Sequence, residues 1–231
     1  MSELYLSGRY GRLNPTWHIE DSAWKAEQIR KLIERHDLRP RTVCEVGCGA
    51  GEILRSLAES FPEMRFVGYD VAPDLATLWS RRPHDRVALE IRDVLHEGAA
   101  VSCDLVLAID MIEHIEDYRG ALKALKQCGE YKILHIPLDL SAQTVLRRGS
   151  LRRVRREVGH LHFFTRETAL GALEDAGYEV LDARLTAPGI ELSRPSLAFT
   201  AAKVPRRVVR RFSDDLAARL LGGFALLVLA R

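Results

Sequence analysis

A glycine-rich turn is the first feature of the sequence that could do chemistry. Glycines stand at positions 47, 49 and 51 within the run EVGCGAGE at 45–52. Glycine lets a backbone approach a ligand where a Cβ atom would clash, and a helix that follows offers free N–H groups. A dinucleotide-binding loop needs a further glycine where this chain has Glu52 or Leu54, and a P-loop needs Gly-Lys-Ser/Thr. The turn therefore predicts a nucleotide-binding loop of another kind.

Acidic residues stand at the ends of three predicted strands. These strands and their acids are 65–69 with Asp70, 87–91 with Asp93, and 104–109 with Asp110. Parallel strands bring their carboxyl ends to one edge of a sheet, where open α/β sheets bind ligands. Asp70 lies 23 positions after Gly47, and a carboxylate there can accept hydrogen bonds from both hydroxyls of a ribose.

Histidines supply the candidate catalytic bases. His114 lies in the run DMIEHIED at 110–117, and His160 lies in GHLHFFTRE at 159–167. We expect both to face the reacting atoms, whereas His135 falls inside a predicted strand and is expected to be buried and hydrogen-bonded. His18 is a candidate for a lid over the site. Imidazole is the usual general base near neutral pH.

The glycine run closely resembles motif I (E-x-G-x-G-x-G) of the class I S-adenosylmethionine-dependent methyltransferases. The order of the acids that follow also resembles this family, from the ribose contact at Asp70 to the adenine contact at Asp93 and the methionine end at Asp110. The resemblance implies S-adenosylmethionine as cofactor, contacted by Glu45, Gly47, Cys48, Gly49, Gly51, Asp70, Val71, Asp93, Val94 and Asp110.

Two further segments resemble a small-molecule subgroup of that family, types 11 and 12. They are the E-H-x-x-D segment at 113–117 and the G-H-x-x-x-[FW]-[ST] segment that begins at Gly159. The resemblance covers about residues 40–231. It implies transfer of a methyl group to a small acceptor. O-methylation is favoured over N- or C-methylation, and the alternatives are an RNA or protein methyltransferase or a catalytically silent cofactor-binding module.

A metal-dependent mechanism is the second implication of the resemblance. Asp110, Glu113, His114 and His160 are similar to the acid-x-x-E-H…H set of small-RNA 2′-O-methyltransferases and, in part, of some ubiquinone O-methyltransferases. Aspartate replaces the usual first glutamate here. Carboxylates and imidazoles suit Mg²⁺, Mn²⁺ or Zn²⁺, which lower the pKa of a hydroxyl. Because the subgroup also has E-H pairs without an ion, catalysis without a metal is favoured and a divalent ion remains the alternative.

The elements that must position these residues alternate between strands and helices. The pattern predicts a helix at 20–36, strands at 42–46, 65–69, 87–91, 104–109, 131–136, 178–185 and 224–230, and helices at 52–60, 74–80, 118–127, 166–176 and 203–221. Residues 1–19 are predicted to be an irregular arm, and Pro137 is predicted to end a strand. This alternation predicts an α/β fold, a Rossmann-like, seven-stranded, mostly parallel sheet with helices on both faces and an antiparallel last strand. The expected division is an N-terminal arm and lid helix at 1–38 and a cofactor-binding domain at 39–231, with a basic acceptor cap at 141–161.

Charge is distributed unevenly along the chain. Residues 1–120 carry 15 Lys+Arg and 21 Asp+Glu, whereas residues 121–231 carry 19 and 11. Six arginines lie between 147 and 156, in the expected acceptor cap, and predict an anionic acceptor. Contact with an anionic membrane surface is a second interpretation. The absence of interleaved aromatic residues argues against nucleic acid as partner.

Composition places the chain among ordinary globular proteins. Hydrophobic residues make up 47% and charged residues 29%. No apolar run reaches the roughly 20 residues that a membrane-spanning helix needs. The four cysteines are too few for a disulfide scaffold, so we expect buried thiols and a cytoplasmic protein. Because the N-terminus is polar, the sequence does not predict a signal peptide there.

Overall fold

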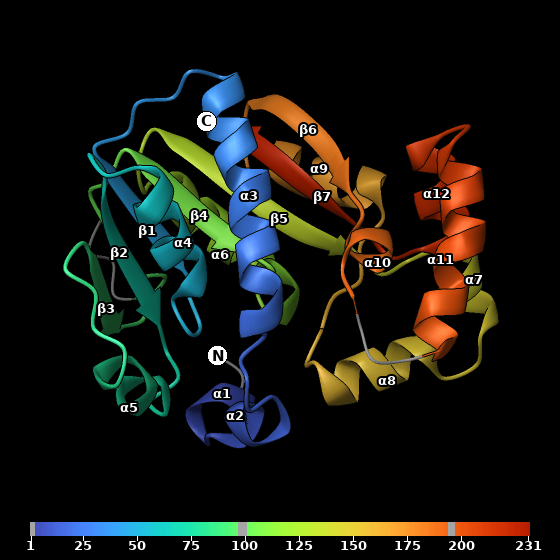
Figure 1. The fold of residues 1–231 in the computed structure, drawn as a ribbon, viewed down its shortest axis with the longest axis horizontal. Coiled ribbons are helices and arrows are strands. Elements are labelled where there is room, and N and C mark those ends of the chain that lie inside the picture. The colour runs from blue at the N-terminus through green and yellow to red at the C-terminus, as the bar shows by residue number, and fades with distance from the viewer. Residues whose placement is uncertain (1–2, 97–100, 194–196) are drawn as a thin grey trace.

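The strands form one seven-stranded sheet in the order β3-β2-β1-β4-β5-β7-β6 (Figure 1). The computed structural model describes residues 3–96, 101–193 and 197–231. The strands are β1 Thr42–Val46, β2 Arg65–Asp70, β3 Val87–Ile91, β4 Leu105–Ile109, β5 Tyr131–Leu138, β6 Val180–Thr186 and β7 Phe224–Ala230. The first five strands in chain order pair in parallel, and β7 is antiparallel to both of its neighbours. The predicted fold class is confirmed.

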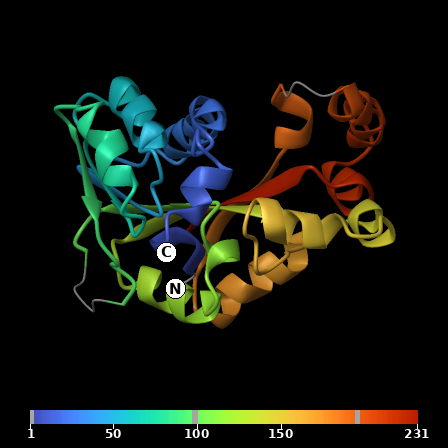
Figure 2. The ribbon, with the colours of Figure 1, turned by 90° about the horizontal axis from the view of Figure 1, so that it is seen from below.

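Helices cover both faces of this sheet (Figures 1 and 2). The helices are α1 Glu3–Leu6, α2 Arg9–Leu13, α3 Ile19–Arg35, α4 Glu52–Ser60, α5 Leu75–Ser80, the 3₁₀ turn η1 Ile112–His114, α6 Tyr118–Lys126, α7 Ala142–Leu146, α8 Ser150–Glu157, α9 Arg166–Asp175, α10 Pro188–Glu191, α11 Leu197–Arg210 and α12 Asp214–Leu221. Apolar residues of α3, α4 and α5 pack in one core and those of α6 and α9 in another. In the described residues, no helix has the length and apolar character that crossing a bilayer requires.

Local sequence explains the centre of the sheet. β4 is a continuous apolar run, LVLAI, and all five of its residues are buried between β1 and β5. A strand covered on both faces has no solvent side on which polar residues could alternate. The four cysteines are buried, and none forms a disulfide, as expected.

The N-terminal arm is more regular than predicted. Residues 1–19 were expected to be irregular, but α1 and α2 are short helices within them. Gly8 separates the two with a φ of 67°, a left-handed conformation that glycine adopts without strain. Helices this short lack a full amphipathic period, and tertiary packing of Tyr10, which is buried, stabilises them instead.

Two other boundaries also differ from the prediction. Strand β5 continues through Pro137 to Leu138, because it pairs there with β7 only and its pairing with β4, on the other side, ends at His135. The helix predicted at 203–221 is two helices, α11 and α12. Ser213 separates them in an extended conformation, and its hydroxyl accepts the N–H of Leu216 as an N-cap.

Asp104 joins the starts of β1 and β4, and we expect its replacement to destabilise the fold. Its Oδ2 accepts the N–H groups of Arg41 and Thr42 at 2.7 and 2.8 Å and the Thr42 hydroxyl at 3.1 Å. Asp104→Ala should lower the free energy of unfolding by about 1 kcal/mol, a value kept small by solvent exposure. Urea denaturation of the variant, with Glu63→Ala as an exposed control, measures this loss.

The same bonds predict how this stabilisation depends on pH. The N–H of Thr42 holds the pKa of Asp104 below its usual value. Stabilisation from a carboxyl with a lowered pKa is complete above the unfolded-state pKa and disappears as the pH falls through the folded-state pKa. The difference between the wild type and Asp104→Ala should therefore be constant near neutral pH and shrink in acid. A difference that grows in acid would contradict this assignment.

Candidate active site

The main cavity lies at the carboxyl ends of β1, β2 and β4, where the chain order of the sheet reverses between β1 and β4. Open α/β sheets bind ligands at this position. The cavity is lined by most of the predicted site residues, namely Glu45, Gly47, Cys48, Gly49, Asp70, Val71, Asp93, Val94, Asp110 and His114. Gly51 and His160 lie outside its described lining.

The glycine turn leaves open space in front of the sheet. Gly47, Gly49 and Gly51 all have positive φ, between 51° and 76°. A Cβ atom on Gly47 would lie 2.7 Å from Met111 Cγ, and one on Gly51 would lie 2.7 Å from Leu89. A Cβ atom on Gly49 would meet nothing closer than Trp17 at 3.9 Å. The turn thus fits a nucleoside placed against Gly49, while the other two glycines are required for internal packing.

Asp70 fastens this turn to β2. Its Oδ2 accepts the N–H of Gly49 at 2.9 Å, and its Oδ1 accepts those of Val71 and Ala72 at 2.7 and 3.0 Å. A carboxylate offers about four acceptor positions, so these three bonds leave about one for a ribose. Burial raises the pKa of Asp70, and the three N–H groups oppose that rise. Both ribose hydroxyls can be accepted only if one backbone bond is exchanged.

The far end of the cavity is formed by residues after β3. Asp93 and Val94 line it together with Arg92. The Asp93 carboxylate lies 2.9 Å from His96 Nδ1, and Val94 is buried. An apolar side chain beside a carboxylate can hold the face and the amino group of a purine.

Asp110 is part of a buried, charged network. Its Oδ2 lies 2.7 Å from Lys25 Nζ, and its Oδ1 accepts from His135 Nδ1 at 2.5 Å. His135 Nε2 lies 2.9 Å from Thr186 Oγ1, so this ring is buried and hydrogen-bonded as predicted. Burial alone would raise the pKa of Asp110, but Lys25 and His135 outweigh it and hold this pKa below its usual range. The negative charge of Asp110 is therefore balanced by Lys25 and His135. The backbone of Asp110 has a strained, left-handed conformation, with a φ of 50°.

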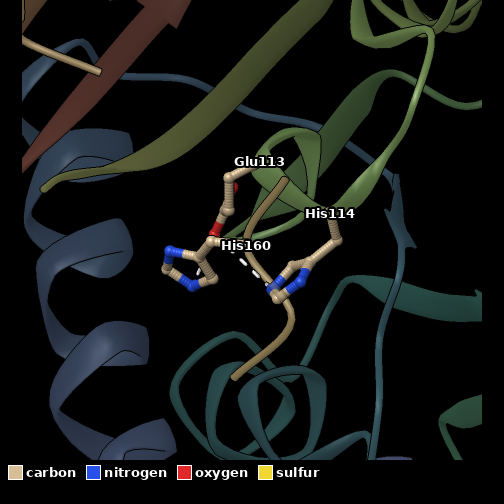
Figure 3. Close-up of side chains that lie close together, drawn as sticks. All are labelled: Glu113, His114 and His160. Atoms are coloured by element: carbon tan, nitrogen blue, oxygen red, sulfur yellow. Dashed lines mark ion pairs between the residues drawn. The ribbon is translucent and has the colours of Figure 1, made fainter. Parts of the chain in front are cut away.

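Glu113, His114 and His160 form a separate cluster (Figure 3). Glu113 Oε1 lies 3.8 Å from His114 Nε2 and 4.0 Å from His160 Nε2. One ligand atom from each residue can be chosen so that all three lie within 4.8 Å of one another. Asp110 does not join them, because Lys25 and His135 occupy its oxygens. The structure therefore brings together three of the four residues of the candidate metal set, and Asp110 lies apart from them.

The carboxyl of Glu113 lacks a hydrogen-bond partner. Its side chain is 0% exposed, and neither oxygen forms a hydrogen bond within the described structure. Burial raises its pKa well above the usual value, and Asp110 adds to this effect. Burial likewise lowers the pKa of His114 to about 3, so this ring is neutral. A buried acid beside a neutral imidazole is a group of side chains that could bind a cation or a hydrogen-bonding ligand.

Asp139 orients the third member of the cluster. Its Oδ2 lies 2.6 Å from His160 Nδ1 and accepts the N–H there, so Nε2 is the ring nitrogen that faces Glu113, 4.0 Å away. A carboxylate behind a histidine is the usual support of a metal-binding or catalytic imidazole. Sequence reasoning missed Asp139 and Lys25. Asp139 could have been found from its position directly after β5, at the same edge as the other acids.

Aromatic residues of the arm cover the cavity. Tyr5, Tyr10, Trp17 and His18 line it. The rings of Tyr5 and Tyr10 lie edge-on to His114, with centroids 5.8 and 6.2 Å away. Asn14 Nδ2 donates to the Glu157 carbonyl, so the arm also touches the end of α8. No arginine of α8 lines the described cavity, and the basic cap therefore does not supply its inner wall.

Comparisons with known proteins agree with this geometry. The methyltransferase-domain family matches residues 17–183. The chain is 28% identical over 167 residues to the ubiquinone biosynthesis O-methyltransferase of Pseudomonas paraeruginosa, covering 67% of this chain and 72% of that protein. It is 24% identical over 111 residues to the trans-aconitate 2-methyltransferase of Rhodococcus jostii, covering 48% of this chain and 42% of that protein.

Solved structures share the fold at low identity. The magnesium protoporphyrin IX methyltransferase from Synechocystis PCC 6803, with bound SAH, has a TM-score of 0.59 at 13% identity, with coverage of 90% of this chain and 82% of that one. The N-methyltransferase NodS from Bradyrhizobium japonicum WM9, in complex with S-adenosyl-L-homocysteine, has a TM-score of 0.53 at 16% identity, with coverage of 97% and 86%. Because the family match spans most of the chain, the protein belongs to the methyltransferase-domain family and is a class I S-adenosylmethionine-dependent methyltransferase.

Proposed function

We propose that the chain methylates an oxygen atom of a small, anionic acceptor bound beside Glu113, His114 and His160. The unpartnered, fully buried carboxyl of Glu113 between two histidines is the observation that carries this proposal. An amine that reacts as its free base needs only orientation, whereas a hydroxyl needs a group that removes or stabilises its proton. This cluster is such a group, and it adjoins the cavity through His114.

In this proposal the cofactor extends along the cavity, and each part of it meets a different set of residues. Gly47, Cys48 and Gly49 would contact the nucleoside, with Gly51 and Glu45 supporting the turn behind them. Asp70 would accept from the ribose, and Val71, Asp93 and Val94 would hold the adenine. Asp110 and its partner Lys25 would meet the charged methionine end. In this proposal residues 1–38 form the lid, residues 39–231 the cofactor-binding domain and residues 141–161 the acceptor cap.

The chain's own residues would contribute orientation and proton handling. Methyl transfer from a sulfonium is an in-line displacement whose leaving group needs no acid, so alignment of donor and acceptor supplies much of the acceleration. Tyr5, Tyr10 and Trp17 would exclude water above the methyl group. His160 is the proposed base, with Asp139 hydrogen-bonded to its Nδ1, and His114, whose pKa is low, is proposed to orient the acceptor.

The donor set also fits a divalent cation. Glu113, His114 and His160 would hold it, and Asp139 would orient His160 from behind. One carboxylate and two imidazoles suit Zn²⁺ or Mn²⁺. When bound, such an ion would lower the pKa of an acceptor hydroxyl.

The anionic character of the acceptor rests on the surface around the arm. The C-terminal end of α8 touches Asn14, and α8 carries exposed Arg152, Arg153, Arg155 and Arg156. These charges would attract an anion toward the mouth of the cavity without lining it. Trans-aconitate, in the name of one relative, is an acceptor of this class.

A panel of acceptors tests the proposal. Formation of S-adenosylhomocysteine should be measured with hydroxy acids and catechols, and with amines, thiols and RNA as comparison classes. Turnover of hydroxylated anions with little turnover of their uncharged analogues is the expected result. Turnover confined to amines, or to RNA, would overturn the proposal. So would tight binding of S-adenosylmethionine without turnover of any class.

A further inference from the structure

Helix α11 presents an apolar stripe to the solvent. Ala201, Val204, Val208 and Phe212 follow one another at intervals of three or four residues, which places them on one helical face. Val204 is 61% exposed, Val208 is 56% exposed and Phe212, just past the helix end, is 82% exposed. A surface helix of a globular protein normally turns such a face toward the core.

Two arginines of α11, Arg206 and Arg210, point the other way. Arg206 Nε donates to the Gly222 carbonyl at 2.8 Å. Arg210 binds Glu191 at 2.9 Å and Asp214 at 3.1 Å, on α10 and at the start of α12. These bonds hold the Arg206 and Arg210 side of α11 inward. The orientation of the apolar stripe is therefore fixed by the packing of the helix against its neighbours.

Positive charge without an ion-pair partner among the described residues borders the stripe. Arg207 and Arg211 are exposed beside Val204 and Val208, and residues 197–213 contain no Asp or Glu. Helix α8, with four exposed arginines, and α7 lie on the same side of the molecule as α11 and α12 (Figures 1 and 2). Apolar residues with arginines at their edge match an anionic lipid surface, which receives the apolar side chains between headgroups and attracts the cations.

We propose that the α11 stripe (Ala201, Val204, Val208 and Phe212) docks this enzyme on anionic phospholipid membranes. Charge favours this occupant over a second copy of the chain. Two such faces packed together would place Arg207 and Arg211 of one copy near the same arginines of the other, and like charges repel. Docking of this kind is peripheral. It would bring an acceptor that resides at, or leaves from, a membrane surface to the methyltransferase.

Vesicle binding tests the proposal. The wild type should sediment with phosphatidylcholine–phosphatidylglycerol vesicles and not with phosphatidylcholine alone, and added salt should weaken the binding. Arg207→Gln with Arg211→Gln should weaken partitioning by roughly 25-fold, about fivefold for each arginine near the leaflet. Val204→Gln with Val208→Gln should weaken it by about tenfold or more, since glutamine retains helix propensity and removes the apolar contact.

Matched controls distinguish docking through the α11 stripe from a general effect of positive charge and from a loss of the folded structure. Arg65→Gln with Arg81→Gln removes two exposed arginines elsewhere and should leave vesicle binding unchanged. All variants should keep wild-type affinity for S-adenosylhomocysteine. The proposal is overturned if the wild type fails to bind anionic vesicles, or if both α11 variants bind them as well as the wild type. A dimer in light scattering that the valine variant dissociates would assign the stripe to a second copy and would also overturn it.

Discussion

Glu113→Gln is expected to reduce methyl transfer by about a thousandfold, the middle of the range for loss of acid–base or metal-assisted chemistry. Glutamine has nearly the same shape as glutamate but cannot be a carboxylate. Affinity for S-adenosylhomocysteine should stay at the wild-type value, because Glu113 lies outside the described lining of the cavity. Steady-state kinetics with an acceptor from the panel, and calorimetry with S-adenosylhomocysteine, measure the two quantities.

Stability separates a chemical role for Glu113 from a structural one. The wild type buries a carboxyl that has no hydrogen-bond partner, which costs free energy. Without added cation, Glu113→Gln should therefore unfold at the same urea concentration as the wild type or a higher one. A loss of both activity and stability would contradict a chemical role. Glu116→Gln, three positions along and exposed, is the matched control.

Cation binding can be tested with the metal alone. Mn²⁺ titration followed by electron paramagnetic resonance should show a site in the wild type that Glu113→Gln removes. Asp139→Asn should weaken that site by roughly 10- to 100-fold, the usual effect of replacing the carboxylate behind a histidine ligand. Full activity in chelator, with no Mn²⁺ site, would reject the ion and leave His160 as the base. Retention of both activity and Mn²⁺ binding by Glu113→Gln would reject the cluster as the reactive centre.

Asp70→Ala is expected to weaken binding of S-adenosylhomocysteine by about a hundredfold. A hydrogen bond from a ribose hydroxyl to a charged carboxylate contributes about 1.5–3 kcal/mol, and the variant also loosens the turn at Gly49. Isothermal titration calorimetry measures the affinity. Asp85→Ala, an exposed acid outside the cavity, should bind as the wild type does.

A modified ligand distinguishes the ribose contact from the loosened turn. In the wild type, the 2′-deoxy analogue of S-adenosylhomocysteine should bind more weakly than the parent compound. If Asp70 accepts from that hydroxyl, the difference between the two ligands should shrink in Asp70→Ala, as in a double-mutant cycle. An equal difference in both proteins would mean that Asp70 acts only on the backbone of the turn. Unchanged affinity in the variant would remove Asp70 from the site altogether.

The parts of the fold that depend on local pattern could be predicted from the sequence. The run LVLAI predicts β4 because a strand buried on both faces needs apolar residues throughout. The glycine turn was also predictable, since three glycines within five residues supply the positive φ angles that the turn uses. In these cases a few neighbouring residues determine the structure.

The parts that depend on partners distant in the sequence could not be predicted in this way. The pairing of Lys25 with Asp110 joins residues 85 positions apart, and it decides that Asp110 lies outside the Glu113 cluster. The orientation of α11 is likewise set by Glu191 and Asp214 on other elements. A sequence pattern shows an amphipathic helix there, but not which of its faces the neighbours take.

The segment between Asp139 and His160 leaves the sheet and returns to the same point. Asp139 binds His160 at one end, and the Glu113 carbonyl accepts the N–H groups of Leu161 and His162 just beyond the other. Helices α7 and α8 therefore lie in a segment whose two ends are held together by hydrogen bonds beside the cluster. A segment of this kind can change in length and sequence while its two ends stay in place. Residues 140–158 can therefore vary while Asp139 and His160, at the two ends of the segment, keep their places beside the cluster.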